Sequence, residues 1–193
     1  MWLPRLVAFF LLLTVGSGDP IYNGPKRLGA FDVVRPTPIK TLLQNLGDPV
    51  SHKSPFCYGY GETAYLRISA IHEQTESAGE FLISGIPNCS PNAIVKTARD
   101  FRSWKTAEGI GLGSPRGDVL KSYGNPTRIQ KPDHELFVRF FSDYASKMRN
   151  ASPIAQEVLL YNGVLKGLPN SWTSARFGIQ DDKVAWIMLT IDD

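Results

Sequence analysis

The residues with the most definite chemistry in this chain of 193 residues are its two cysteines, Cys57 and Cys89. Two cysteines permit one disulfide, and no further cysteine or histidine lies at the short spacing that a zinc site requires. Closing a loop of this size stabilises a fold by about 3 to 4 kcal/mol if chain entropy dominates. We therefore predict a Cys57–Cys89 disulfide, with two free buried thiols as the alternative.

The three histidines, His52, His72 and His134, are the candidates for acid–base chemistry. His72 and His134 each precede a glutamate, as in the helix of a zinc protease, but neither has a second histidine four residues later. No G-x-S-x-G motif marks a serine hydrolase. Any histidine could still act as general base for a distant serine, so a small extracytoplasmic hydrolase stays an alternative. We assign no catalytic residue, metal ligand or cofactor.

Two further motifs resemble functional patterns. The glycines of GIGLGSPRG, residues 109–117, lack the spacing of a dinucleotide fingerprint and the lysine of a P-loop, so we interpret them as a bend before a helix. Asn88 and Asn150 each begin a glycosylation sequon, and both sequons are followed by proline. We interpret these two sequons as accidental.

An aromatic segment at residues 134–148 has the spacing of an amphipathic helix. Phe137, Phe140, Phe141 and Tyr144 fall on one face, and charged residues lie opposite. An apolar helix face normally packs on the protein's own core. The alternative is a docking helix whose aromatic side chains bind a partner.

The first eighteen residues have the order of a secretory signal peptide. Arg5 precedes an apolar run of about ten residues, which is shorter than the roughly 20 needed to span a bilayer, and Gly16, Ser17 and Gly18 follow. We expect cleavage near Gly18/Asp19 and a secreted or periplasmic protein without a membrane anchor. An oxidising compartment also favours the disulfide.

The net charge of the chain and the placement of its basic residues argue against a nucleic-acid partner. Without Arg5, the chain has 20 Lys and Arg against 18 Asp and Glu, a formal charge of 20 − 18 = +2. The basic residues are dispersed along the sequence rather than gathered in a stripe. We therefore expect no nucleic-acid partner.

A duplicated segment suggests how the chain is organised. TPIKTLLQNLGDP, from Thr37, recurs without gaps as SPRGDVLKSYGNP, from Ser114. Each copy predicts a helix of about three turns, capped by Thr37 or Ser114 and ended by Gly47 or Gly124. Residues rich in β-branched and aromatic types follow each helix and predict strands at 56–60, 64–71, 80–86, 157–163, 174–179 and 183–191.

These elements predict an α+β fold of two tandem units. Residues 19–90 form the first unit and residues 91–193 the second, each a short capped helix followed by an antiparallel meander. The helix at 134–148 is an insertion in the second unit.

The capped helix that ends in Gly, one residue and Pro, together with the closing FGIQDDKVAWIML, resembles the small envelope lipoproteins of the SmpA/OmlA type. Two such units in tandem are similar to the β-lactamase-inhibitor protein family. The resemblance implies a non-catalytic protein-binding role, either as an inhibitor or as an envelope-assembly accessory, with an extracytoplasmic protein partner. A small-ligand carrier is a further alternative.

Overall fold

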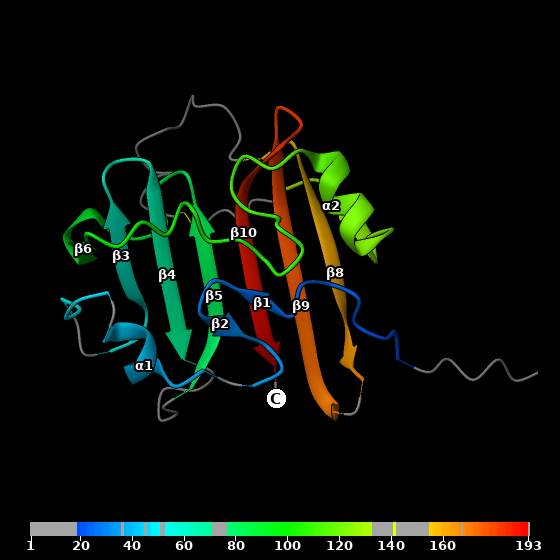
Figure 1. Ribbon diagram of the computed structural model, residues 1–193, viewed down its shortest axis with the longest axis horizontal. Coiled ribbons are helices and arrows are strands. Elements are labelled where there is room, and N and C mark those ends of the chain that lie inside the picture. Colours follow the sequence, from blue (N-terminus) through cyan, green and yellow to red (C-terminus); the bar gives the residue numbers. More distant parts are fainter. Residues whose placement is uncertain are drawn as a thin grey trace, which may run out of the picture.

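The computed structural model describes residues 19–35, 37–44, 46–50, 53–70, 77–132, 141, 155–166 and 168–192. Its centre is an eight-stranded sheet with the strand order β6-β3-β4-β5-β10-β9-β8-β7 (Figure 1). The strands are β3 (Phe56–Tyr60), β4 (Ala64–Ala70), β5 (Ala78–Ser84), β6 (Ile94–Lys96), β7 (Arg128–Gln130), β8 (Glu157–Leu165), β9 (Leu168–Gln180) and β10 (Lys183–Asp192).

The predicted α+β fold of two helix-and-meander units is wrong, because the protein is mostly β. The two meanders exist, as β3-β4-β5 and β8-β9-β10, but strands β5 and β10 pair antiparallel and join them in one sheet. The sheet is mixed, since β6 pairs with β3 in parallel while the other pairs are antiparallel. The described α-helices are short: α1 (Ile39–Leu43) has five residues and α2 (Arg116–Tyr123) has eight.

The helices start and end for reasons that only partly match the sequence prediction. Gly124 ends α2 with a φ of 73°, a backbone conformation that favours glycine. The expected side-chain caps are absent from both described helix starts. Thr37 Oγ1 instead accepts from the N–H of Asp32 at 3.2 Å, and Ser114 Oγ accepts from the N–H of Gly111 at 2.9 Å.

The two predicted repeat segments make matching contacts. The carbonyl of Gly47 accepts a hydrogen bond from Tyr58 at 2.9 Å, and the carbonyl of Gly124 accepts one from Tyr161 at 3.1 Å. Each tyrosine lies on a strand of the meander that follows its helix. The internal duplication itself stays a prediction.

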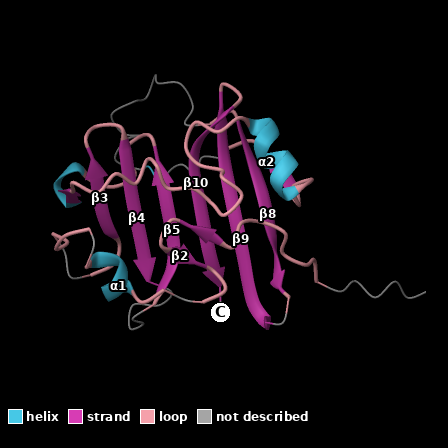
Figure 2. Ribbon diagram, viewed as in Figure 1, coloured by secondary structure: helices cyan, strands magenta, loops and turns pink. Residues whose placement is uncertain are grey.

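The main core lies on one face of the sheet and includes residues from both halves of the chain. That face is covered by α1, α2, the loop between β6 and α2, and a hairpin of β1 (Arg27–Leu28) and β2 (Phe31–Asp32) (Figures 1 and 2). Among the described residues, loops and a hairpin rather than long helices cover this face. A single-turn 3₁₀ helix, Pro91–Ala93, precedes β6.

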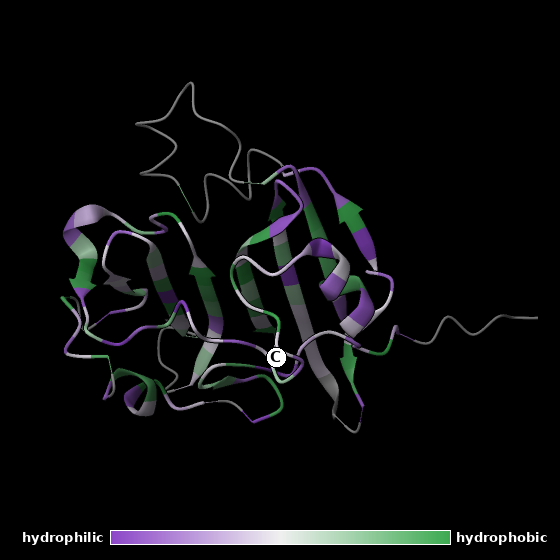
Figure 3. Ribbon diagram, turned by 45° about the horizontal axis from the view of Figure 1, so that its top comes forward, coloured by the Kyte–Doolittle hydropathy of each residue, from purple (hydrophilic) through white to green (hydrophobic). Residues whose placement is uncertain are grey.

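Along a strand such as β4, successive residues alternate between the two faces of the sheet. Ala64, Leu66 and Ile68 of β4 are buried in the main core, while Tyr65 and Arg67 point to the opposite face and are half-buried. All seven residues of the central strand β5 are buried, including the polar residues Glu80 and Ser84. Figure 3 shows the resulting alternation of hydrophobic and hydrophilic residues along the strands.

A smaller apolar cluster occupies the opposite face of the sheet. Its buried members are Leu82, Phe141, Ala155, Val158, Trp186 and Met188. Trp186 lies over Gly178 of the neighbouring strand, in the space that a Cβ atom would need. Among the described residues, no helix is long and apolar enough to cross a membrane.

Candidate binding surface

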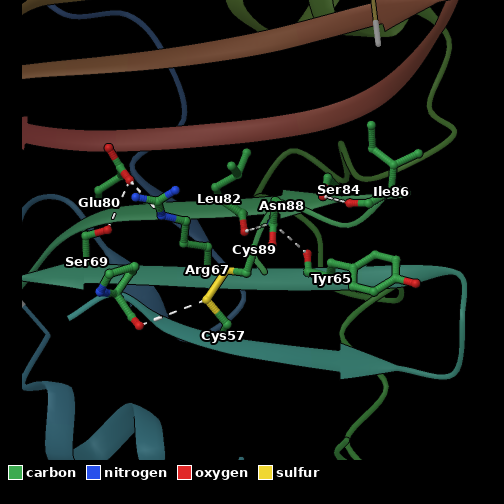
Figure 4. The surroundings of a disulfide bond; sticks show 11 residues. Cys57, Tyr65, Arg67, Ser69, Glu80, Leu82, Ser84, Ile86, Asn88 and Cys89 are labelled. Atoms are coloured by element: carbon green, nitrogen blue, oxygen red, sulfur yellow. Dashed lines mark hydrogen bonds and ion pairs between the residues drawn. A yellow bond between two sulfur atoms is a disulfide. The ribbon is translucent and has the colours of Figure 1, made fainter. Parts of the chain in front are cut away.

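The predicted disulfide is present. Cys57, on β3, is bonded to Cys89, which follows β5, and their Cα atoms are 6.3 Å apart (Figure 4). This bond ties β3 to the segment that returns as edge strand β6 and pairs with it. A disulfide fits a protein that works in an oxidising compartment.

Asn88, next to the disulfide, is buried and has a structural role. Only 2% of its surface is exposed, and its side-chain N–H group donates to the carbonyls of Tyr65 and Leu82, each at 3.4 Å. It therefore bridges β4 and β5 beside the crosslink (Figure 4). The folded chain does not present this sequon asparagine to solvent.

A charged pair lies on the same face of the sheet as the disulfide. Glu80 Oε1 is 3.7 Å from Nε of Arg67 and accepts a hydrogen bond from Ser69 at 3.1 Å (Figure 4). The Glu80 side chain is only 9% exposed. A buried carboxylate needs such partners, so we interpret this group as a structural link between β4 and β5.

The aromatic docking candidates are only partly described. Phe141 is 2% exposed, and its ring centroid is 6.2 Å from that of Trp186, so this side chain belongs to the smaller core cluster. Phe137, Phe140 and Tyr144 lie outside the described residues, and so do the three histidines, His52, His72 and His134. Within the described part of the chain, no three His, Cys, Asp or Glu residues form a metal-binding group.

The loop between β6 and α2, residues 97–115, crosses the core-covering side of the molecule (Figure 1). A loop of this length without regular structure is uncommon in a compact domain and is usually either functional or a disordered linker. It is nevertheless firmly held, because Phe101, Thr106 and Ile110 are at most 5% exposed. Buried anchors make the loop a preorganised surface rather than a solvated tail.

Aromatic stacking fixes the loop and the hairpin to the same sheet residue. Phe81 of β5 stacks on Phe31 of the hairpin, with ring centroids 5.1 Å apart, and on Trp104 of the loop, at 5.8 Å. Phe101 packs edge-on against Trp104 at 6.2 Å. Such pairs add about 0.5 to 1.5 kcal/mol each beyond their buried area.

The hairpin and the loop also contact each other directly. Leu28 and Thr106 form an antiparallel bridge, and the N–H of Gly29 donates to the carbonyl of Lys105 at 3.3 Å. Gly29 has a φ of +57°, and Trp104 fills the space where a side chain at this position would lie. Gly29 is thus required both by the turn and by the packing of Trp104.

Because Leu28 and Thr106 point into the core, their neighbours point outward. Arg27 and Lys105 are both exposed, and they are diagonal neighbours across the bridge. We call the exposed side chains Lys26, Arg27, Arg35 and Lys105 the hairpin–loop surface.

Arg102, earlier in the loop, is already neutralised. Its guanidinium pairs with Asp100 at 3.1 Å and lies 4.8 Å from the ring centroid of Tyr60. The hydrogen bond from Arg102 holds the pKa of the Asp100 carboxyl below its usual value. We therefore do not include this pair in the hairpin–loop surface.

No protein-family model matches the chain, and we found no significant match among the curated proteins or the solved structures. The function must therefore be argued from the chain itself.

The middle of the loop, at Thr106 and Glu108, is fixed by a hydroxyl network. The Tyr123 hydroxyl is 2.6 Å from Thr106 Oγ1 and 2.7 Å from Glu108 Oε2. Burial is the largest influence on the pKa of Tyr123 and raises it well above its ordinary value. Tyr123 therefore stays neutral at physiological pH and acts as a hydrogen-bonding anchor.

Sequence reasoning overlooked this surface, although a signal was present. Residues 96–105, KTARDFRSWK, interleave basic and aromatic residues, contrary to our view that the basic residues are merely dispersed. The structure separates the two types: Phe101 is fully buried and Trp104 half-buried, while Arg99, Arg102 and Lys105 are exposed. The basic and aromatic residues alternate because the aromatic side chains anchor the loop on the sheet while the basic side chains face solvent.

Proposed function

We propose that this chain is an exported, non-catalytic module that binds another protein through its hairpin–loop surface. The observation that carries the proposal is the long loop that aromatic anchors hold on the sheet and that directs basic side chains outward beside the hairpin. Binding residues are often placed on loops that a rigid scaffold positions.

Four other features of the chain support the proposal. The predicted signal peptide at residues 1–18 and the disulfide both fit an exported protein. The resemblance to SmpA/OmlA-type lipoproteins and to β-lactamase-inhibitor proteins implies the same class of role, either inhibition or envelope assembly. Both edges of the sheet end in three-residue strands, β6 and β7, which carry Lys96 and Arg128. Short basic edges oppose strand addition by a partner and leave side-chain contacts as the binding mode.

The first test is affinity capture from the culture supernatant or periplasm of the source organism, with oxidised residues 19–193 as bait. We compare the unchanged chain with Lys105→Glu and with Lys121→Glu, a matched reversal of an exposed lysine on α2. A specific partner should be retained by the unchanged chain and by Lys121→Glu, and lost with Lys105→Glu.

Thermal unfolding of each bait controls for folding. Lys105→Glu should unfold like the unchanged chain, because Lys105 is exposed. Equal retention of the partner by all three baits would refute the hairpin–loop surface as the binding site. Failure of every bait to retain a specific protein would refute the binding function.

A further inference from the structure

We infer that the hairpin–loop surface recognises an acidic, extended segment of its protein partner. This inference rests on the proposed function and names the chemistry of the partner. Four lines of observation carry it: the charge of the surface, the fixed state of its carboxylates, the backbone spacing of two cations, and the burial of its aromatic residues.

The surface has a local excess of positive charge. Lys26, Arg27, Arg35 and Lys105 are all exposed, while the carboxylates of the hairpin segment 26–35 and of the loop 97–115 are Asp32, Asp100 and Glu108. Asp100 pairs with Arg102, and Glu108 accepts a hydrogen bond from the Tyr123 hydroxyl. Asp32 Oδ1 accepts from two backbone N–H groups of the following turn, at 2.8 and 3.1 Å. Because this carboxylate is engaged in the turn, it is poorly placed to pair with the cations.

The backbone positions of two of the cations have a defined relation. Arg27 and Lys105 flank the isolated Leu28–Thr106 bridge as diagonal neighbours, and the backbone positions of such neighbours are about 7 to 8 Å apart. The Arg27 Nε donates to the carbonyl of Gly29 at 2.8 Å, which orients the guanidinium along the hairpin. Alternate side chains of an extended strand lie roughly 6.6 Å apart, so two carboxylates at positions i and i+2 match this pair.

Two other anionic partners fit the surface less well. A single-stranded nucleic acid needs exposed aromatic rings for its bases, but Phe101 is fully buried and Trp104 is committed to stacking on Phe81. Membrane association needs apolar side chains that enter the lipid. Among the described residues, Val34 is the one large exposed hydrophobic residue of the hairpin region.

The test is fluorescence anisotropy with labelled twelve-residue peptides and oxidised residues 19–193. One peptide alternates Glu and Ser, a second contains the same residues as Glu-Glu-Ser-Ser blocks, and a third replaces Glu with Gln. We expect the alternating peptide to bind about tenfold more tightly than the Gln peptide and measurably more tightly than the block peptide. Lys105→Glu should weaken this binding about fivefold or more, and Lys121→Glu less than twofold.

Equal effects of the two charge reversals, or equal affinity for the alternating and block peptides, would overturn the inference. Tighter Lys105-dependent binding of oligo-dT, or of vesicles rich in anionic lipid, would overturn it in favour of another class of ligand. These results are separable from the capture experiment. If partner capture depends on Lys105 but the peptides fail, the binding function stands and the acidic chemistry is wrong.

Discussion

The indole of Trp186 lies over Gly178 across the β9–β10 pair, where a Cβ atom on Gly178 would collide with the ring. The glycine thus leaves room for Trp186, the largest fully buried side chain among the described residues. The ring of Phe141 packs against that of Trp186 in a tilted geometry, with centroids 6.2 Å apart. One strand pair therefore closes the smaller core cluster on the face opposite the hairpin–loop surface.

Replacement of Gly178 should destabilise the fold. Gly178→Ala forces Trp186 to move within a packed cluster, and we expect a loss of about 1 to 3 kcal/mol in the free energy of unfolding, with a changed near-ultraviolet circular dichroism spectrum. Gly117→Ala, in α2, is the matched control, because a side chain there meets open space. Urea unfolding that shows no difference between the two variants would contradict the packing described for Trp186.

Gly29 links the fold to the proposed function. Gly29→Ala should both destabilise the protein and weaken partner binding, because Trp104 and the loop must shift although no charged residue changes. Gly61→Ala is the control: Gly61 has a similar φ of +56° but nothing near its missing side chain. We expect Gly29→Ala to cost roughly 1 to 2 kcal/mol more than Gly61→Ala in urea unfolding. Unchanged binding by a destabilised Gly29→Ala variant would show that the loop's position does not matter.

The disulfide should contribute strongly to stability. It closes a loop of 32 residues, so Cys57→Ala/Cys89→Ala should lower the free energy of unfolding by about 3 to 4 kcal/mol. The measurement is urea unfolding of the oxidised chain, the reduced chain and the double variant. We expect the reduced chain and the double variant to agree. A double variant as stable as the oxidised chain would mean that the bond adds nothing to the fold.

Two buried tyrosines predict alkaline destabilisation. Burial raises the pKa of Tyr58 and of Tyr161 to about 12, and nearby Asp48 adds to the effect at Tyr58. The folded pKa is above the value near 10 of the unfolded chain, so the stabilisation is complete below pH 10 and is lost as the pH rises toward 12. Thermal midpoints should therefore fall steeply above pH 10, and Tyr58→Phe should reduce this slope. An identical slope in Tyr58→Phe would exclude Tyr58 as a contributor.

Much of the local structure was predictable from sequence, because its signals are short-range. The hairpin turn before Lys183 has Asp181 and Asp182 at φ values of 50° and 59°, as expected from its length. The strand segments after each helix and the Cys57–Cys89 bond were also predicted correctly. Each depends on residues within one element or on a pairing with one possible outcome.

The global arrangement was not predictable, because it depends on pairings between distant segments. The sequences of β5 and β10 do not indicate that Leu82 pairs with Met188. This strand pairing joins the two meanders. The three-residue strand β6 is set by the disulfide and by parallel pairing with β3, not by its own pattern. The alternation of basic and aromatic residues at 96–105 could have indicated the loop, but not that Arg27 and Lys105 become neighbours, because they do so only after folding.

The most direct test of the proposed function is site-specific photo-crosslinking during export in the source organism. A photoreactive side chain replaces Ala107, which is exposed beside Thr106, the bridge partner of Leu28, or Ser122, which is exposed on α2. We predict a discrete protein adduct from position 107 that disappears when Lys105→Glu is added, and none from position 122. An adduct from position 122 alone, or one from position 107 that persists with Lys105→Glu, would contradict binding through the hairpin–loop surface.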